Sequence, residues 1–285
     1  MSGDNGGAHA EIVRPGGDPD ALVPAAGGIG ATIRAQDGDG EAFALAFMGK
    51  LLRLRGVRID REHFLTAELR RRRVAEDVIV RAVADRPAAA GVAAETLDDI
   101  ARHSIAFETE KSATMAFAAG LPGGFALVGT VPADIAQYYV HAFRVMQELA
   151  YLYGWQSLLD DCLEVDDETL GELGAFLGVM LGVAGASTAL TGFASNVARP
   201  ALQKQLASKA LTRTACYPVV KQTLKRVGVQ INKQIFARTV TKVVPLVGGI
   251  VSGGLTCASL RTGSGRLTEH LRTLPPALPD PATEA

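Results

Sequence analysis

The chain has 285 residues, of which 48% are hydrophobic, 6% aromatic and 21% charged, and its net charge is −1. This composition excludes a wholly disordered protein, because it supplies enough apolar residues for the core of one large domain or two small ones. Good helix formers are abundant and runs of β-branched residues are few. We therefore predict an all-α fold, a glycine-rich helical bundle with closely packed helical hairpins.

The cysteines and histidines exclude two further classes of protein. Cys162, Cys216 and Cys257 are far apart and form no CxxC pair, and the five histidines have no metal-ligand spacing. Neither a disulfide framework nor a zinc site is indicated, and a reducing cytosol fits best. Because we also find no catalytic motif, we predict a non-enzymatic protein with no cofactor and no metal.

The first part of the chain, residues 1–40, is rich in Gly, Asp, Ala and Pro and shows no helical periodicity. We predict that it is a disordered tail. It lacks the basic and apolar regions of a secretion signal, so we expect none. A single helical domain is predicted over 41–272, and a second disordered tail over 273–285.

The domain is expected to open with a helix from Glu41 that stops at Gly56. The next helical stretch has Asp60 as a plausible N-terminal cap. Its arginine run, 70–73, could suggest nucleic acid, but acidic residues surround the run on both sides. Ion pairing on a solvated helix face is therefore the better interpretation.

The helix expected over 130–155 carries a narrow polar line. At 100° per residue, five polar residues fall within an arc of about 80°, and apolar residues cover the rest of the helix. These candidate ligand-binding residues are Asp134, Gln137, His141, Arg144 and Glu148. Facing inward, they could bind a polar ligand or perform acid and base chemistry. Facing water, they would be ordinary, with Arg144 and Glu148 forming an i,i+4 pair.

Two uncharged stretches, 173–198 and 243–260, raise the question of a membrane span. In the first, Gly174, Gly178 and Gly182 recur every four residues, a spacing that lets another backbone approach closely in membrane and soluble helices alike. Both stretches mix Gly, Ala, Ser and Thr and lack interfacial Trp. We therefore predict hairpins buried inside a helical bundle. The alternatives are integral membrane hairpins and insertion of one hairpin into a single leaflet.

The segment between these stretches is predicted to form short amphipathic helices with basic polar faces, a pattern suited to an anionic membrane. Pro218 suits the first turn of one helix, and Gly228 suits a C-terminal stop. The candidate residues for binding an anionic surface are Lys204, Lys209, Arg213, Lys221, Lys225, Arg226, Lys233, Arg238 and Lys242.

Charge is unevenly distributed along the chain. Residues 1–172 hold 27 acidic and 16 basic residues, whereas no acidic residue occurs between Glu172 and Glu269. We therefore divide the domain into an acidic half, 41–172, and a basic half, 173–268. Such asymmetry favours a polyanionic partner. The alternative is that the two halves pack on each other and neutralise one another.

Three segments resemble successive signatures of the EcsC protein family. They are AAGLPGG, TVPADIAQYYVHAFRVMQELAYLYGW and KRVGVQINKQIFARTVTKVVPLVGGIVSGGLT, and the similarity covers roughly residues 90–270. The resemblance implies a bacterial protein, a helical fold and a membrane connection, but no established reaction. It also implies a set of positions that the fold needs, none of them catalytic: Gly123, Gly124, Asp134, Pro245, Gly248, Gly249, Gly253 and Gly254.

These observations predict a cytoplasmic protein that binds peripherally to the inner face of the cell membrane. Its basic half would contact anionic lipid, and it would assist a membrane protein complex. The alternatives are a small-ligand binder or enzyme using the polar line, and an integral membrane protein. Nucleic acid is the least favoured partner, because only Tyr217 and Phe236 lie between Arg199 and Arg266 for base stacking.

Overall fold

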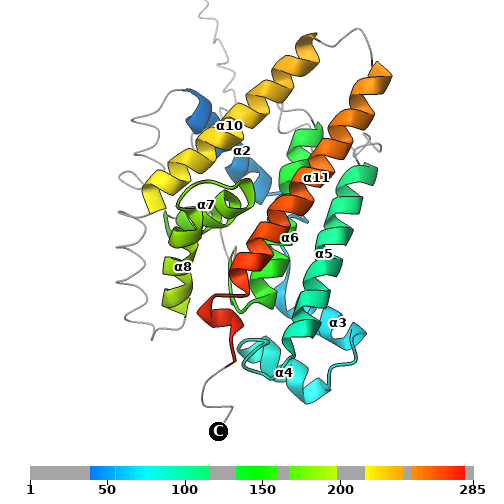
Figure 1. Ribbon diagram of the computed structural model, residues 1–285, viewed down its shortest axis with the longest axis vertical. Coiled ribbons are helices and arrows are strands. Elements are labelled where there is room, and N and C mark those ends of the chain that lie inside the picture. The colour runs from blue at the N-terminus through cyan, green and yellow to red at the C-terminus, as the bar shows by residue number, and fades with distance from the viewer. Residues whose placement is uncertain are drawn as a thin grey trace, which may run out of the picture.

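The computed structural model describes residues 39–54, 56–115, 133–158, 167–197, 216–240 and 245–279. Within these residues the fold is helical throughout, which confirms the all-α prediction (Figure 1). The helices are α2 (Asp39–Leu52), α3 (Arg61–Arg71), α4 (Glu76–Ala84), α5 (Ala94–Met115), α6 (Ala133–Leu152), α7 (Asp167–Leu181), α8 (Ala186–Val197), α10 (Tyr217–Val240), α11 (Pro245–Leu271) and the 3₁₀ helix η3 (Pro275–Ala277).

Helix α6 is the central element of the bundle. It packs against α5 and α11, and also against α2, α3 and α7. Apolar side chains cover most of its circumference, so it can bury several faces at once. Tyr139, Phe143 and Leu149 are among its fully buried residues. The predicted tail 1–40 lies almost wholly outside the described residues, and α2 begins at Asp39, two residues before the expected start.

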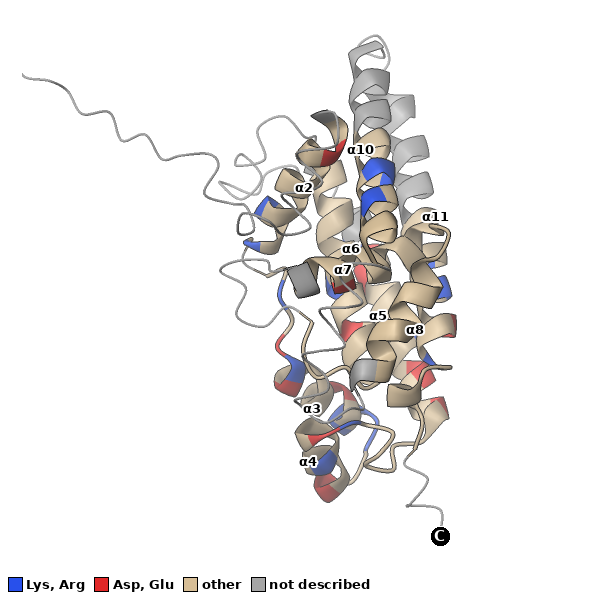
Figure 2. Cartoon of the chain, turned by 90° about the vertical axis from the view of Figure 1, so that its left-hand side faces the viewer, with Lys and Arg blue, Asp and Glu red and all other residues tan. Residues whose placement is uncertain are grey.

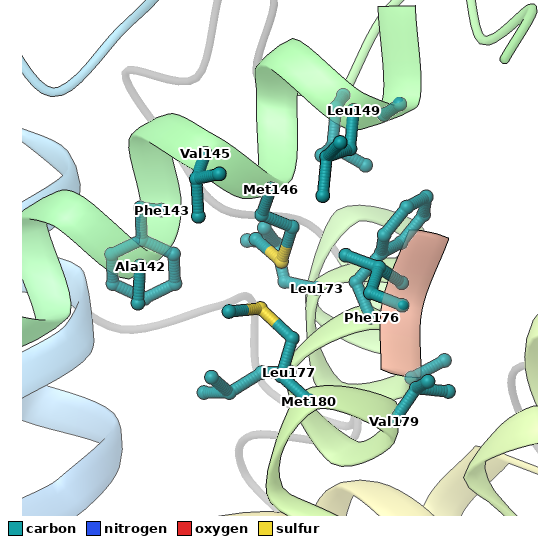
Figure 3. Close-up of a cluster of buried hydrophobic side chains, with 14 of the residues drawn as sticks. Ala142, Phe143, Val145, Met146, Leu149, Leu173, Phe176, Leu177, Val179 and Met180 are labelled. Atoms are coloured by element: carbon teal, nitrogen blue, oxygen red, sulfur yellow. The ribbon is translucent and has the colours of Figure 1, made fainter. Parts of the chain in front are cut away.

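The core between α6 and α7 is built from aliphatic, methionine and phenylalanine side chains. Figure 3 shows Met146 of α6 and Met180 of α7 at the centre of this cluster. At one end of α6, the ring of Trp155 meets Phe176 of α7 edge to face, with centroids 5.3 Å apart. Unbranched methionines fill irregular gaps, and the aromatic pair adds directional contact, so side chains of α6, α7 and the segment after α6 share one core.

Helices α7 and α8 form the helical hairpin predicted for 173–198. The amide of Gly182, at a φ of +67°, donates to the Val179 carbonyl over 3.1 Å, and Val183 N donates to Gly178 O over 2.8 Å. This pattern ends a helix with a left-handed glycine. A methyl group on Gly178 would lie 2.9 Å from the Ala186 Cβ of α8, so the close packing depends on glycine.

Glycine also brings α10 and α11 close to α7. A methyl group on Gly174 would lie 2.7 Å from Val220 Cγ2 of α10. On α11, a methyl group on Gly263 would lie 2.8 Å from the Met180 carbonyl oxygen. Real Cβ contacts are not this short, so these glycines permit a backbone approach that no other residue allows. The prediction of a glycine-packed helical bundle is confirmed at these positions.

The predicted helix stop at Gly228 is wrong. Pro218 does lie in the first turn of α10, as expected, but the helix continues through Gly228 to Val240. A methyl group on Gly228 would meet the Gly40 carbonyl of α2 at 2.7 Å. The glycine therefore serves a helix crossing, where α10 and α2 touch, instead of a helix end.

Residues 273–279, which we expected to belong to a disordered tail, instead pack on the domain. Leu274 and Pro276 are buried, and η3 spans Pro275–Ala277. Gly154, at a φ of +96°, contacts the Pro276 backbone closely and leaves no room for a side chain. Two prolines that restrict the chain and an apolar leucine explain why this segment is ordered.

The stretch that follows Asp60 forms two helices, because Arg73 adopts a φ of +59° between α3 and α4. Asp60 caps α3 as predicted, since its Oδ1 accepts from His63 N over 2.6 Å. Three arginines of the run are ion paired, as predicted: Arg70 pairs with Glu76, Arg71 with Glu68, and Arg72 with Glu68 and Asp99.

The two halves of the domain pack on each other. In the basic half, α10 lies against α2, and α11 lies against α5 and α6. No described helix has an apolar stretch long enough to cross a bilayer. The uncharged stretch 173–198 is interrupted by the turn at Gly182, and most of 243–260 belongs to α11.

Candidate functional site

The polar line on α6 faces inward, toward α5. Gln137, His141 and Glu148 are 6%, 4% and 5% exposed, and Arg144 is partly buried. Asp134 belongs to α6, but its side chain lies outside the described part. Together with buried polar residues of α5, these side chains form what we call the α5–α6 seam. Its members are Ser104, Glu108, Gln137, His141, Arg144, Gln147 and Glu148.

Glu108 of α5 organises the seam. Its carboxylate is fully buried; Oε2 lies 2.6 Å from His141 Nδ1, and Oε1 accepts from Arg144 Nε over 2.9 Å. Burial alone would raise the pKa of Glu108, but the hydrogen bond with His141 and the positive charge of Arg144 outweigh it. The net effect is a lowered pKa. Because an ionised carboxylate only accepts hydrogen bonds, His141 Nδ1 must carry the proton.

Arg144 and Gln147 hold the segment between α2 and α3 through hydrogen bonds to its backbone. Arg144 Nη1 donates to the Gly56 carbonyl. Gln147 Nε2 donates to Val57 O over 2.8 Å, and Gln147 Oε1 accepts from Ile59 N over 3.0 Å. These bonds satisfy the polar backbone of a segment that lies against the core. An i,i+4 pair of Arg144 with Glu148 was expected only for a line that faces water; in the inward-facing line, Arg144 forms its ion pair with Glu108.

Glu148 is a carboxyl group without a full set of partners. Its Oε2 has no hydrogen-bond partner among the described residues, while the hydroxyl of Ser104 bonds to the carboxyl group. Burial raises its pKa to about 8; Glu108 and Glu68 add to the rise, and Arg144 opposes it. A carboxyl group this buried and close to two others keeps its proton near neutral pH.

The seam thus holds two carboxyl groups whose pKa values are pushed in opposite directions, a pattern that acid and base catalysts also show. In this chain the ionised group, Glu108, is fully engaged with His141 and Arg144. Gln137 Nε2 and Glu148 Oε2 are buried without partners among the described residues. The contacts of the seam join α5, α6 and the segment before α3, which favours a structural role.

The second candidate site is the exposed side of α10, which we call the α10 face. At 100° per residue its members fall within an arc of about 140°. They are Pro218, Lys221, Gln222, Lys225, Arg226 and Val229. Figure 2 shows basic residues on this helix and no acidic ones. Val229 is 43% exposed, so a large apolar side chain lies in water beside two cations.

The opposite side of α10 anchors the face to the domain. Val220, Leu224 and Val227 are at most 1% exposed, and Thr223 Oγ1 donates to the Gly174 carbonyl of α7 over 3.2 Å. An apolar buried side and a cationic exposed side make α10 amphipathic. The helix therefore presents Lys225 and Arg226 on a rigid support.

The structure describes part of the predicted anionic-surface set. Lys225 and Arg226 are exposed, and Lys221 is partly exposed. Lys233 and Arg238 belong to α10, but their side chains lie outside the described part. The other predicted residues also lie outside it: Lys204, Lys209, Arg213 and Lys242.

Sequence reasoning missed the α5 side of the seam. Ser104 and Glu108 are spaced by four and follow Leu97 and Ala101 on the same helix face. All four residues are buried. The signal was therefore present, as two polar residues continuing an apolar stripe, but a polar residue at the edge of a stripe is usually exposed.

Searches against protein-family models, curated proteins and solved structures found no match. The resemblance to the EcsC family stays a prediction from the sequence motifs.

Proposed function

We propose that the protein is a peripheral, non-enzymatic membrane protein that binds anionic lipid at the inner face of the cell membrane through the α10 face. The observation that carries this proposal is the composition of that face. Lys225 and Arg226 are exposed beside Pro218 and Val229, on a helix without a single acidic residue. Cations interspersed with exposed apolar groups are the pattern of helices that lie in a membrane interface.

The free energy of binding to an anionic membrane is the sum of electrostatic and apolar contributions from the α10 face. A basic residue close to an anionic surface contributes about 1 kcal/mol, and this contribution falls off within a Debye length. Exposed apolar area at Val229 adds a term that salt does not screen. We therefore expect binding that requires anionic lipid, weakens with salt and leaves a weak residual affinity.

The α5–α6 seam is not the basis of this proposal. The carboxylate of Glu108 is committed to His141 and Arg144, and Gln147 binds backbone groups. A ligand would have to displace these bonds to reach the same atoms, which would leave buried charges without partners.

The test is flotation of the protein with vesicles of phosphatidylcholine, with and without phosphatidylglycerol, at low and high salt. Lys225→Glu reverses one charge on the α10 face and should weaken binding by about 2 kcal/mol, roughly thirtyfold. Arg81→Glu is the matched control, because Arg81 is an exposed cation on α4, at the far end of the bundle from α10 (Figure 1). It changes the net charge equally and should leave binding nearly unchanged.

Equal losses in the two variants would mean that net charge, not the α10 face, controls binding. Absence of flotation with either lipid mixture would refute the proposal altogether.

A further inference from the structure

Two arginines from the basic half meet at the C-terminus of α7. Arg226 of α10 donates from Nη1 to the Gly182 carbonyl over 3.2 Å. Arg266 of α11 donates from Nη1 to the Met180 carbonyl, also over 3.2 Å. The carbonyl end of a helix carries partial negative charge, which attracts both guanidinium groups to one place.

Both guanidinium groups lie against the same residue, Gly182. Arg226 binds its carbonyl, and a methyl group on Gly182 would lie 3.4 Å from Arg266 Nη1. Arg226 and Arg266 are both exposed residues. Both side chains are therefore accessible from solvent.

Most of the described arginines pair with carboxylates, whereas Arg226 and Arg266, like Arg61, donate to backbone carbonyls. Outside the basic half, eight described arginines form ion pairs with carboxylates: Arg70, Arg71, Arg72, Arg81, Arg86, Arg102, Arg144 and Arg272. Arg226 and Arg266 have carbonyl partners instead, and neither has a carboxylate partner among the described residues. Among the described residues, the partners of these two like charges are the carbonyls at the C-terminus of α7, whose partial negative charge offsets part of their repulsion.

We infer that Arg226 and Arg266 form a phosphate clamp at the C-terminus of α7, and that its ligand is the phosphomonoester head group of an anionic lipid. This inference rests on the proposed function. A guanidinium group has five N–H donors in a fixed fork that matches phosphate, and each arginine uses one of them on a carbonyl. A phosphomonoester has three terminal oxygens and a charge near −2, so two guanidinium groups can share it.

A phosphodiester offers two terminal oxygens and a single charge, so it suits the pair less well. The clamp therefore predicts lipid selectivity beyond attraction to a negative surface. Vesicles that contain phosphatidic acid and vesicles that contain phosphatidylglycerol should be compared after their surface potentials have been matched. We expect the protein to bind the phosphatidic acid vesicles about tenfold more tightly, as one or two additional charge-assisted hydrogen bonds would produce.

The deciding variant is Arg226→Lys combined with Arg266→Lys. Lysine keeps both charges and can still reach a carbonyl, but it lacks the planar fork. Because Arg226 also belongs to the α10 face, the readout is the ratio of the affinities for phosphatidic acid and phosphatidylglycerol, and the tenfold preference for phosphatidic acid should disappear. Arg81→Lys with Arg102→Lys is the matched control and should keep the preference. If the double variant does not fold, the single Arg266→Lys variant provides the same comparison.

The outcomes separate the clamp from the proposed function. The clamp alone would be overturned by a preference for phosphatidic acid that survives in the double lysine variant. It would also be overturned by binding to phosphatidylglycerol with neither a preference for phosphatidic acid nor protection by a soluble phosphate. No binding to either vesicle would overturn both. Soluble glycerol 3-phosphate is the third arm: if it protects the wild type but not the double variant from thermal unfolding, and vesicles show no preference, the ligand is a soluble phosphate and the lipid assignment is wrong.

Discussion

The α5–α6 seam and the α10 face both contain several charged side chains, but those of the seam have partners or are neutral, whereas those of the face are exposed. In the seam, Glu108 is hydrogen bonded to His141 and Arg144, and Glu148 is neutralised by keeping its proton. On the α10 face, Lys225 and Arg226 are exposed without a carboxylate partner among the described residues. The comparison separates charges that hold the fold together from charges that remain available to a partner.

The difference has a physical cause. A buried charge without a partner lowers the folding stability by several kcal/mol, so a stable fold requires partners for the buried charges of the seam. An exposed cation costs almost nothing, so folding places no acidic residue beside Lys225 and excludes none. The absence of acids from all of α10 is therefore not explained by stability, and binding to an anionic partner would explain it.

The largest expected effect comes from removing the charge at the centre of the seam. Glu108→Gln keeps the shape of the side chain but leaves His141 and Arg144 without their carboxylate. Because Arg144 is partly exposed, we expect the free energy of unfolding to fall by about 3 kcal/mol, at the low end for a broken buried ion pair. Urea unfolding followed by circular dichroism measures this change.

Glu110→Gln is the control for that experiment. Glu110 lies on the same helix two residues later and is exposed. Its substitution should change the free energy of unfolding by less than about 1 kcal/mol. Similar losses in the two variants would break the comparison, since the seam would then be no more important than an exposed site.

A smaller effect should appear as a dependence of stability on pH. Burial raises the pKa of Glu148 to about 8 in the folded chain, whereas an unfolded glutamate has a pKa near 4.3. Between these values the folded state keeps a proton that the unfolded state has released, so stability falls as pH rises. Relative to Glu148→Gln, the wild type should lose about 2 kcal/mol between about pH 5.5 and pH 7.

Glu148→Gln is the isosteric reference because glutamine resembles the protonated acid and can keep the bond with Ser104. The loss should be complete above about pH 8. The titration of Glu108 does not interfere with this measurement. Its pKa is lowered, so its contribution to folding stability changes only in more acidic solution and in the opposite direction. Parallel pH profiles for the wild type and Glu148→Gln would show that Glu148 is ionised in the folded protein.

The smallest effect concerns how α11 is positioned beside α7. Gly263→Ala would place a methyl group 2.8 Å from the Met180 carbonyl, whereas a methyl group on Gly265 of the same helix has nothing within 4 Å. Overpacking should outweigh the gain in helix propensity, so Gly263→Ala should lower the melting temperature by the equivalent of about 1 kcal/mol. Gly265→Ala should raise it slightly. Changes of the same sign would refute close packing by Gly263.

Periodicity predicted much of the fold. The stripe Gly174 and Gly178 predicted a close approach, and Asp60 predicted a helix start. Gly228 was misread because a glycine within a helical pattern can mark either an end or a crossing. Only the position of Gly40 on another helix decides between these, and that position is not a local property of the sequence.

The candidate site was predictable on one helix at a time. The polar line on α6 was visible because His141 and Arg144 stand out among apolar residues. Its orientation and its partner were not, since Glu108 is 33 positions from His141 along the chain. The meeting of Arg226 and Arg266 at Gly182 likewise depends on three helices packing together.

The most direct test of the central claim is to place a tryptophan on the α10 face. Val229→Trp adds a reporter at an exposed position of α10, and Val80→Trp adds one at an exposed position of α4. The native Trp155 is 1% exposed and provides a constant background. With anionic vesicles that contain brominated lipid, we predict a blue shift and quenching for Val229→Trp and neither for Val80→Trp. Unchanged fluorescence of Val229→Trp, or equal quenching at both positions, would contradict the assignment of the α10 face as the membrane-binding surface.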